Sequence, residues 1–131
     1  MQIGDLSRNA GVNVETIRYY ERAGVLPVPA RQGNGRRIYG EADVRRLGFI
    51  RHARDLGFDL QSVRTLLALQ EQPEASCTDA SRIAQAQLDE VERRLAQLQS
   101  LRAELSRMVA ECRKGVVAEC RVIEALNTSP F

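Results

Sequence analysis

The chain has 131 residues, and its lack of tryptophan and small number of aromatic residues predict a modest hydrophobic core in one small domain with an appendage. The net charge is only +2, but residues 1–70 carry eleven arginines against seven acidic residues, whereas residues 71–131 carry eight basic and ten acidic residues, so an anionic polymer is expected to bind the first half. No apolar run is long enough to span a membrane and no signal peptide opens the chain, so we expect a cytoplasmic protein with no membrane partner.

Two short helices are predicted at the start of the chain, over residues 3–10 and 14–23. Gly11 and Gly24 supply the turn conformations that end them, and Asn13 is a suitable N-cap for the second helix. Two short helices separated by Gly-Val-Asn are typical of a helix-turn-helix, whose second helix enters the major groove of DNA. A helical hairpin in any small bundle is the simple alternative, and this pattern alone does not exclude it.

The second helix has an apolar side and a polar side. Ile17 and Tyr20 are three residues apart and are expected to face the core. The residues expected to project toward a DNA duplex are Thr16, Arg18, Tyr19 and Arg22.

A hairpin with a tight Gly/Asn turn is predicted over residues 31–39. Its tip carries Arg31, Arg36 and Arg37, with Tyr39 beside them. A two-stranded loop with arginines at its tip, placed after a helix-turn-helix, is typical of a wing that contacts the phosphates of DNA. A solvated charged hairpin is the alternative, and the small number of compensating acids disfavours it.

Two further amphipathic helices are predicted over residues 41–56 and 60–69, and Pro73 closes the domain. We therefore expect residues 1–73 to form a winged helix-turn-helix DNA-binding domain with connecting helices. The arginines of the helix over residues 41–56 that are expected to be exposed are Arg45, Arg46, Arg51 and Arg54.

One uninterrupted amphipathic helix is predicted over residues 79–111, which contain neither glycine nor proline. Its apolar residues recur at alternating spacings of three and four, with Arg102 at one seam position, and this predicts a coiled coil. A helix of this length spans about 50 Å and cannot bury its seam within so small a monomer, so we expect a homodimer with residues 74–111 as the dimerisation helix. The seam residues are Leu88, Val91, Leu95, Leu98, Leu105, Val109 and Cys112.

Three cysteines, Cys77, Cys112 and Cys120, stand at the ends of this helix and after it. An odd number of thiols in a reducing compartment indicates metal or redox chemistry rather than disulfides, although ordinary buried thiols are an alternative. Three thiolates suit one low-coordinate site for a soft metal ion. Cys77 and Cys112 are about 50 Å apart along one helix, so we expect an antiparallel dimer in which each site combines Cys77 of the partner subunit with Cys112 and Cys120. Residues 112–131 would form the metal-binding loop and a short C-terminal helix.

Several motifs recur together in one known family. They are Ile3-Gly4-Asp5-Leu6, Val14-Glu15-Thr16-Ile17-Arg18-Tyr19-Tyr20-Glu21, Gly24-Val25-Leu26, Arg37-Ile38-Tyr39, Phe49-Ile50-Arg51 and Gly57-Phe58, followed by the coiled coil that ends in the cysteine loop. On these residues the chain resembles the MerR-family transcriptional regulators over essentially its whole length. The resemblance implies a mainly α fold, with a winged helix-turn-helix and an antiparallel coiled-coil dimer.

The same resemblance implies a mechanism and a DNA interface. Such a regulator binds a palindromic operator in an over-long promoter spacer and, with its effector bound, distorts the DNA so that RNA polymerase can use both promoter elements. By matching positions, Arg18, Tyr19, Arg37 and Tyr39 are expected to contact the operator. Arg36 stands where metal-sensing relatives often carry an apolar or aromatic residue, and we interpret it as an additional phosphate contact.

Within this family the cysteines resemble those of the heavy-metal-sensing branch. Copper, silver and gold sensors keep the pair matching Cys112 and Cys120 but have serine at the position of Cys77, where sensors of divalent ions have cysteine. The length of the loop between Cys112 and Cys120 is nevertheless that of the copper sensors. His52 is the only histidine and lies in the DNA-binding half, so the thiolates favour Hg, Pb or Cd over Zn.

Competing functions can be weighed on the same residues. A sensor of monovalent copper, silver or gold and a thiol-based redox sensor remain the alternatives. A drug-sensing regulator would need a larger C-terminal domain. An enzyme is not expected, because the chain has no acid–base constellation or phosphate-binding loop.

Overall fold

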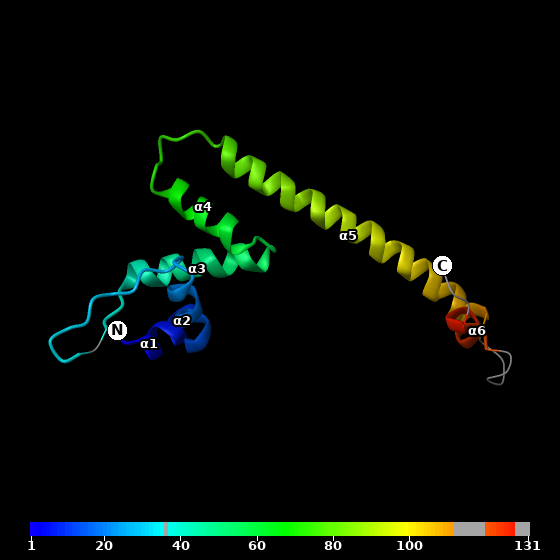
Figure 1. Ribbon diagram of the computed structural model, residues 1–131, viewed down its shortest axis with the longest axis horizontal. Helices are drawn as coiled ribbons and strands as arrows, with labels where there is room; N and C mark the ends of the chain where they lie inside the picture. Colours follow the sequence, from blue (N-terminus) through cyan, green and yellow to red (C-terminus); the bar gives the residue numbers. More distant parts are fainter. Residues whose placement is uncertain (36, 112–119, 128–131) are drawn as a thin grey trace. The chain divides into compact units, whose positions relative to one another are not determined.

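The structure, a computed structural model, describes residues 1–35, 37–111 and 120–127 (Figure 1). The chain divides into two units, Met1–Gln87 and Leu88–Phe131. The described residues are mainly helical, which confirms the predicted fold class. Their helices are α1 (Ile3–Ala10), α2 (Val14–Arg22), α3 (Glu41–Asp55), α4 (Leu60–Gln70), α5 (Thr78–Glu111) and α6 (Arg121–Asn127).

Glycine and asparagine set the ends of α1 and α2, as predicted. Gly11 has a φ of 68° and its N–H donates to the Ser7 carbonyl over 2.9 Å, which ends α1 in a left-handed cap. The Asn13 side chain accepts a hydrogen bond from the Thr16 N–H over 2.8 Å and starts α2. These two caps produce the short turn that defines the helix-turn-helix.

One hydrophobic core holds the first unit together, and α3 lies between α4 on one side and α1 and α2 on the other (Figure 1). Ile17 is fully buried and Tyr20 is nearly so, which confirms the apolar side predicted for α2. Full burial of one such aliphatic side chain contributes roughly 1.5–3 kcal/mol. The buried residues are Leu6, Val12, Ile17, Tyr20, Val25, Leu26, Tyr39, Leu47, Ile50, Ala53, Val63 and Leu67.

Several arginines of the first unit bind backbone carbonyls. Arg46 Nε donates to the Val25 carbonyl over 3.0 Å, and its side chain is only 30% exposed. The prediction that Arg46 is an exposed residue was therefore wrong, because this guanidinium lies over the chain that leaves α2. Three exposed arginines also bind carbonyls: Arg51 that of Ala10, Arg54 that of Phe58 and Arg64 that of Ala23.

Among the described residues between 31 and 39, the chain folds back on itself without forming a regular hairpin. Arg31 and Arg37 form a single antiparallel β-bridge, and the Gly35 N–H donates to the Gln32 carbonyl over 2.8 Å. The predicted hairpin is thus reduced to one pair, because an isolated two-stranded ribbon with no apolar face has little to stabilise longer pairing. We call residues 31–37 the wing segment.

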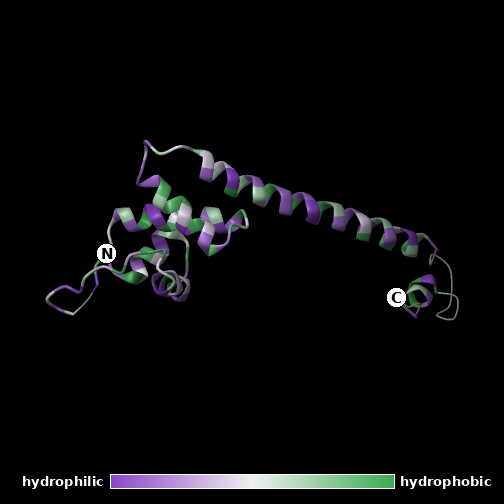
Figure 2. Cartoon of the chain, turned by 45° about the horizontal axis from the view of Figure 1, so that its top comes forward, coloured by the Kyte–Doolittle hydropathy of each residue, from purple (hydrophilic) through white to green (hydrophobic). Residues whose placement is uncertain are grey.

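Helix α5 carries a row of exposed apolar side chains. None of its 34 residues, all of which the structure describes, is buried. In Figure 2 hydrophobic residues (green) recur along α5 among hydrophilic and intermediate ones. No helix among the described residues is long and apolar enough to cross a membrane. The exposed apolar residues of α5 are Leu88, Val91, Leu95, Leu98, Leu101, Leu105 and Val109, which we call the apolar stripe.

Candidate nucleic-acid interface and cysteine positions

Two basic cavities lie between α2 and the wing segment. Arg18 on α2 and Arg37 in the wing segment line both, and each cavity has a volume of about 260 Å³. Guanidinium groups from two elements around a hollow of this size suit an anionic oxygen cluster such as a phosphate. The first cavity is lined by Gln2, Ile3, Arg18, Arg31, Gly35, Arg37 and Tyr39, and the second by Arg18, Glu21, Arg22, Val28 and Arg37.

Tyr39 joins the chain after the wing segment to helix α2. Its side chain is only 3% exposed, and its hydroxyl donates a hydrogen bond to Glu21 Oε2 over 2.8 Å. Its backbone N–H donates to the Met1 carbonyl over 2.7 Å. Burial, together with the nearby Glu21 carboxylate, raises the pKa of Tyr39 to about 12. The tyrosine hydroxyl therefore stays protonated and engaged within the protein at neutral pH.

The other predicted DNA contacts on α2 occupy different environments. Arg18 is exposed and Tyr19 is 46% exposed, with its ring centroid 5.8 Å from that of Tyr20. Thr16 is half-buried, and its backbone N–H is already bonded to the Asn13 side chain. Arg36 lies outside the described residues. Direct contact of each predicted residue with DNA stays a prediction.

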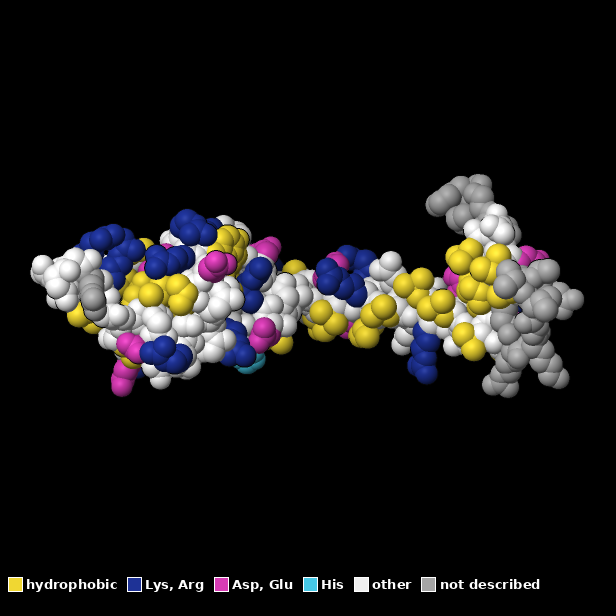
Figure 3. Space-filling view, turned by 90° about the horizontal axis from the view of Figure 1, so that it is seen from below, with side chains coloured by type: hydrophobic (Ala, Val, Ile, Leu, Met, Phe, Trp, Pro, Cys, Tyr) yellow, Lys and Arg dark blue, Asp and Glu magenta, His cyan; other side chains and the backbone are white. Residues whose placement is uncertain are grey.

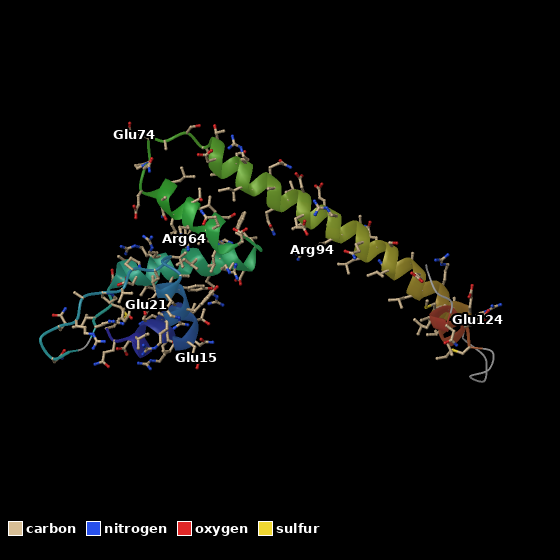
Figure 4. All side chains as sticks on the ribbon, viewed as in Figure 1. Glu15, Glu21, Arg64, Glu74, Arg94 and Glu124 are labelled. Carbon is tan, nitrogen blue, oxygen red and sulfur yellow. The ribbon has the colours of Figure 1, made fainter. Side chains whose placement is uncertain are left out.

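Sequence reasoning missed the role of Glu21 and the position of Gln2. Glu21, labelled on α2 in Figure 4, was named only within a motif, yet it accepts the Tyr39 hydrogen bond and lines the second cavity. The available signal was spacing, since Glu21 follows Arg18 by three residues and therefore lies on the same face of α2. Gln2 lines the first cavity, and no pattern in the sequence places it near residues 31–37.

Figure 3 shows arginine side chains spread over the Met1–Gln87 unit, in agreement with the charge division along the sequence. Their roles differ, however. Arg46, Arg51, Arg54 and Arg64 are engaged with carbonyls, whereas Arg18 and Arg37 face the cavities. The surface between α2 and the wing segment is therefore the candidate nucleic-acid interface.

Two of the three cysteines lie at helix starts within the described part of the chain. Cys77 is exposed and its carbonyl accepts from the Ser81 N–H over 2.9 Å at the start of α5. Cys120 is half-buried and its carbonyl accepts from the Glu124 N–H over 3.0 Å at the start of α6. Cys112 lies outside the described residues. In the ranges that the structure describes, one chain gathers no group of three or more potential metal ligands.

Known proteins resemble the chain over nearly its full length. Residues 1–70 match the family described as MerR HTH family regulatory protein, and residues 44–108 match the one described as MerR, DNA binding. The chain is 42% identical over 129 residues to the HTH-type transcriptional regulator ZntR of Escherichia coli (strain K12), a match that covers 96% of this chain and 92% of that protein.

Two solved structures agree with this match. One is the transcription regulator PbrR691 from Ralstonia metallidurans CH34 in complex with lead(II), with a TM-score of 0.82, 34% identity and coverage of 96% of this chain and 98% of that chain. The other is MerR from Bacillus megaterium MB1 in complex with the mercury(II) ion, with a TM-score of 0.72, 32% identity and coverage of 98% and 100%. The chain therefore belongs to the MerR family of helix-turn-helix transcriptional regulators, which are not enzymes.

Proposed function

We propose that this protein is a cytoplasmic, metal-responsive transcriptional regulator that binds operator DNA as a homodimer. With a divalent soft metal ion bound, it distorts the DNA and so activates a heavy-metal resistance promoter for RNA polymerase. Hg, Pb and Cd are the favoured ions, and Zn is a less favoured candidate. Support comes from the relatives, because PbrR691 was solved with lead(II) and MerR with mercury(II).

The dimer is supported by α5. Its apolar stripe has nothing to pack against within the helix, and the exposed fractions of its members range from 40% at Val91 to 64% at Val109. A stripe whose members recur at spacings of three or four pairs with a similar stripe on a second helix. An apolar cavity of about 580 Å³, lined by Leu98, Leu105 and neighbouring residues, lies along it and would receive the side chains of the second copy.

The metal site would combine Cys112 and Cys120 with Cys77 of the partner subunit. A straight helix of 34 residues, the length of α5, spans about 50 Å, so the thiol before it and the thiols after it cannot bind one ion in the same chain. Antiparallel pairing places the start of one α5 beside the end of the other and gives two equivalent sites per dimer. The dipole of α5 would stabilise the Cys77 thiolate at its N-terminus.

The donor set fits a soft metal. Cys77 is exposed, so its thiol is open to an ion, and thiolate sulfur selects soft cations. Three thiolates around a divalent cation leave a net charge of −1, which is also the charge of two thiolates around a monovalent cation. The presence of Cys77 therefore favours a divalent ion, and a loop of copper-sensor length between the other two cysteines favours the monovalent alternative.

The single observation that carries the metal assignment is the exposed thiol of Cys77 at the start of α5. The test is titration of the reduced protein with Hg(II), Pb(II), Cd(II), Zn(II) and Cu(I), followed by ultraviolet thiolate-to-metal charge transfer and operator-dependent transcription. We expect saturation at two divalent ions per dimer, and loss of the divalent response in Cys77→Ser. Ser76→Ala is the matched control, because it alters the same exposed turn without removing a thiol.

Other outcomes separate the alternatives. A full response in Cys77→Ser, or a marked preference for Cu(I), would replace the divalent assignment by a monovalent one. Transcription that responds to oxidant with no bound metal would identify a redox sensor.

A further inference from the structure

Arg102 has mainly apolar neighbours on α5. It lines the 580 Å³ cavity beside Leu98, Leu105 and Val109. The ion pairs of α5 among the described residues are Arg82 with Asp79 and Arg93 and Arg94 with Glu90. Within the described ranges, neither Arg102 nor Glu92 forms an ion pair. A guanidinium that is covered by a second helix needs a counter-charge, and its own helix supplies none.

The apolar stripe restricts how two copies of α5 can pair. In an antiparallel coiled coil the two kinds of seam position face one another, so the numbers of facing residues add to a constant total. Leu95 facing Leu98 of the partner subunit gives a total of 193, and sliding by one heptad either way gives 186 or 200. Parallel pairing would instead place Arg102 against Arg102 of the partner subunit, and these two positive charges would repel each other.

The antiparallel dimer rests on the proposed function. Helix α5 ends at Glu111, and each of the three totals sets leucines or valines of the apolar stripe against one another, so the charge of Arg102 has to distinguish the registers.

Of the three registers, only the one with a total of 193 sets an acid beside Arg102. With 100° per residue, a residue four positions after a seam residue points only 40° away from it and so flanks the seam on that side. In an antiparallel pair, the corresponding flanks of the two helices face each other. Arg102 then shares a layer with the partner's Val91, and its flanking neighbour is the partner's Glu92. The registers with totals of 186 and 200 place Arg102 beside the partner's Gln85 or the partner's Gln99 instead, neither of which is charged.

We propose that Arg102 and Glu92 form an ion pair between the two copies, twice per dimer, and that this pair fixes the antiparallel register of α5. The pair neutralises the guanidinium within the apolar stripe and disfavours both the slipped and the parallel arrangements.

Charge reversal tests the pair in the full-length protein. Glu92→Arg and Arg102→Glu each set like charges against one another, and we expect each to weaken dimerisation by about tenfold or more in sedimentation equilibrium. The double variant E92R/R102E restores opposite charges and should regain most of the loss. Arg107→Glu makes the same chemical change on the outward side of α5 and should leave the dimer dissociation constant within about twofold.

Cross-linking reads the register directly. In a chain with the three natural cysteines changed to serine, we expect a short bifunctional thiol reagent to couple the E92C/R102C variant into a dimer, while E92C or R102C alone does not couple. Equal losses in the two single reversals and the double reversal, or coupling of the single variants, would overturn the proposal even if the protein remains a metal-responsive dimer. A monomeric wild-type chain would instead refute the dimer itself.

Discussion

The hydroxyl of Tyr39 donates a hydrogen bond to Glu21 Oε2 over 2.8 Å, and this contact joins the segment after the wing to the recognition helix α2. Arg18 precedes Glu21 by one helical turn, and Arg37 precedes Tyr39 by two residues. The bond therefore helps to set the separation between the two arginines that line both basic cavities.

The same bond predicts a loss of stability at alkaline pH. The pKa of Tyr39 is about 12 in the folded protein, whereas an unfolded tyrosine titrates near pH 10. The folded state holds the proton more tightly, so its contribution is complete below about pH 10 and is lost as the pH rises toward 12. The free energy of unfolding of Tyr39→Phe, measured at pH 9 and pH 11, should fall less than that of the wild type. The exposed Tyr19→Phe should keep the wild-type fall.

Replacement of Glu21 should separate its hydrogen bond from its charge. Glu21→Ala leaves a buried hydroxyl without an acceptor and should cost about 1–3 kcal/mol of stability, with weaker operator binding. Glu21→Gln keeps an acceptor oxygen and should recover most of both losses. Glu15→Ala removes the same charge from an exposed site on α2 and serves as the control (Figure 4). Equal operator affinities for Glu21→Ala and Glu21→Gln would show that only the charge matters.

Alanine at Arg18 or Arg37 should change the salt dependence of operator binding. Each phosphate contact that is lost lowers the slope of log K against log salt concentration by about 0.9, and a dimer loses two such contacts per substitution. Fluorescence anisotropy at several salt concentrations measures this slope. Arg107→Ala on α5 should leave it unchanged. A weaker affinity with an unchanged slope would argue against phosphate contacts by these two residues.

Gly57→Ala should destabilise the first unit. Gly57 has a φ of 90°, which costs a residue with a side chain about 1–2 kcal/mol, and an added Cβ would lie 2.3 Å from Gln87 Nε2. The Gln87 amide donates to the Leu56 carbonyl over 3.0 Å and would have to move. In urea unfolding, the cost in a Gln87→Ala background should be smaller than in the wild type. Gly48→Ala, within α3 and with open space around the added Cβ, should stabilise the protein by up to about 1 kcal/mol.

Arg46→Met should cost about 1–3 kcal/mol in thermal unfolding. It removes the bond to the Val25 carbonyl and the ion pair with Glu71, whose atoms are 3.3 Å apart. Arg46→Lys should not restore the loss, because lysine lacks the Nε donor. The neighbouring Arg45→Met, at an exposed position, should stay within about 0.5 kcal/mol of the wild type.

The helices of the first unit could be predicted because their ends depend on local residues. Gly11 and Asn13 determine the turn through their own backbone and side-chain preferences, and the predicted start of α2 agrees with the structure. The wing segment could not be predicted in the same way. Whether its pairing extends beyond Arg31 and Arg37 depends on packing that no local pattern contains.

The roles of individual arginines could not be predicted from the sequence either. Arg45 and Arg46 are neighbours of the same type, yet one points to solvent and the other binds the Val25 carbonyl, which lies 21 residues earlier in the chain. Contact of Tyr39 with the operator stays a prediction, and its burial, which the sequence did not indicate, follows from contacts with Glu21 and Met1 that are distant in the sequence. The residue type of the cysteines predicts thiolate chemistry, whereas the proposed metal site needs a second chain and so could not be read from local patterns.

The apolar stripe of α5 has a consequence for the life of a newly made chain. The first unit has a core of its own, but α5 contains no buried residue and reaches a hydrophobic core only in the proposed dimer. A single chain exposes this strip of leucine and valine to solvent. Pairing of two chains is a second-order process, so below the dissociation constant the concentration of the proposed dimer would fall with the square of the chain concentration.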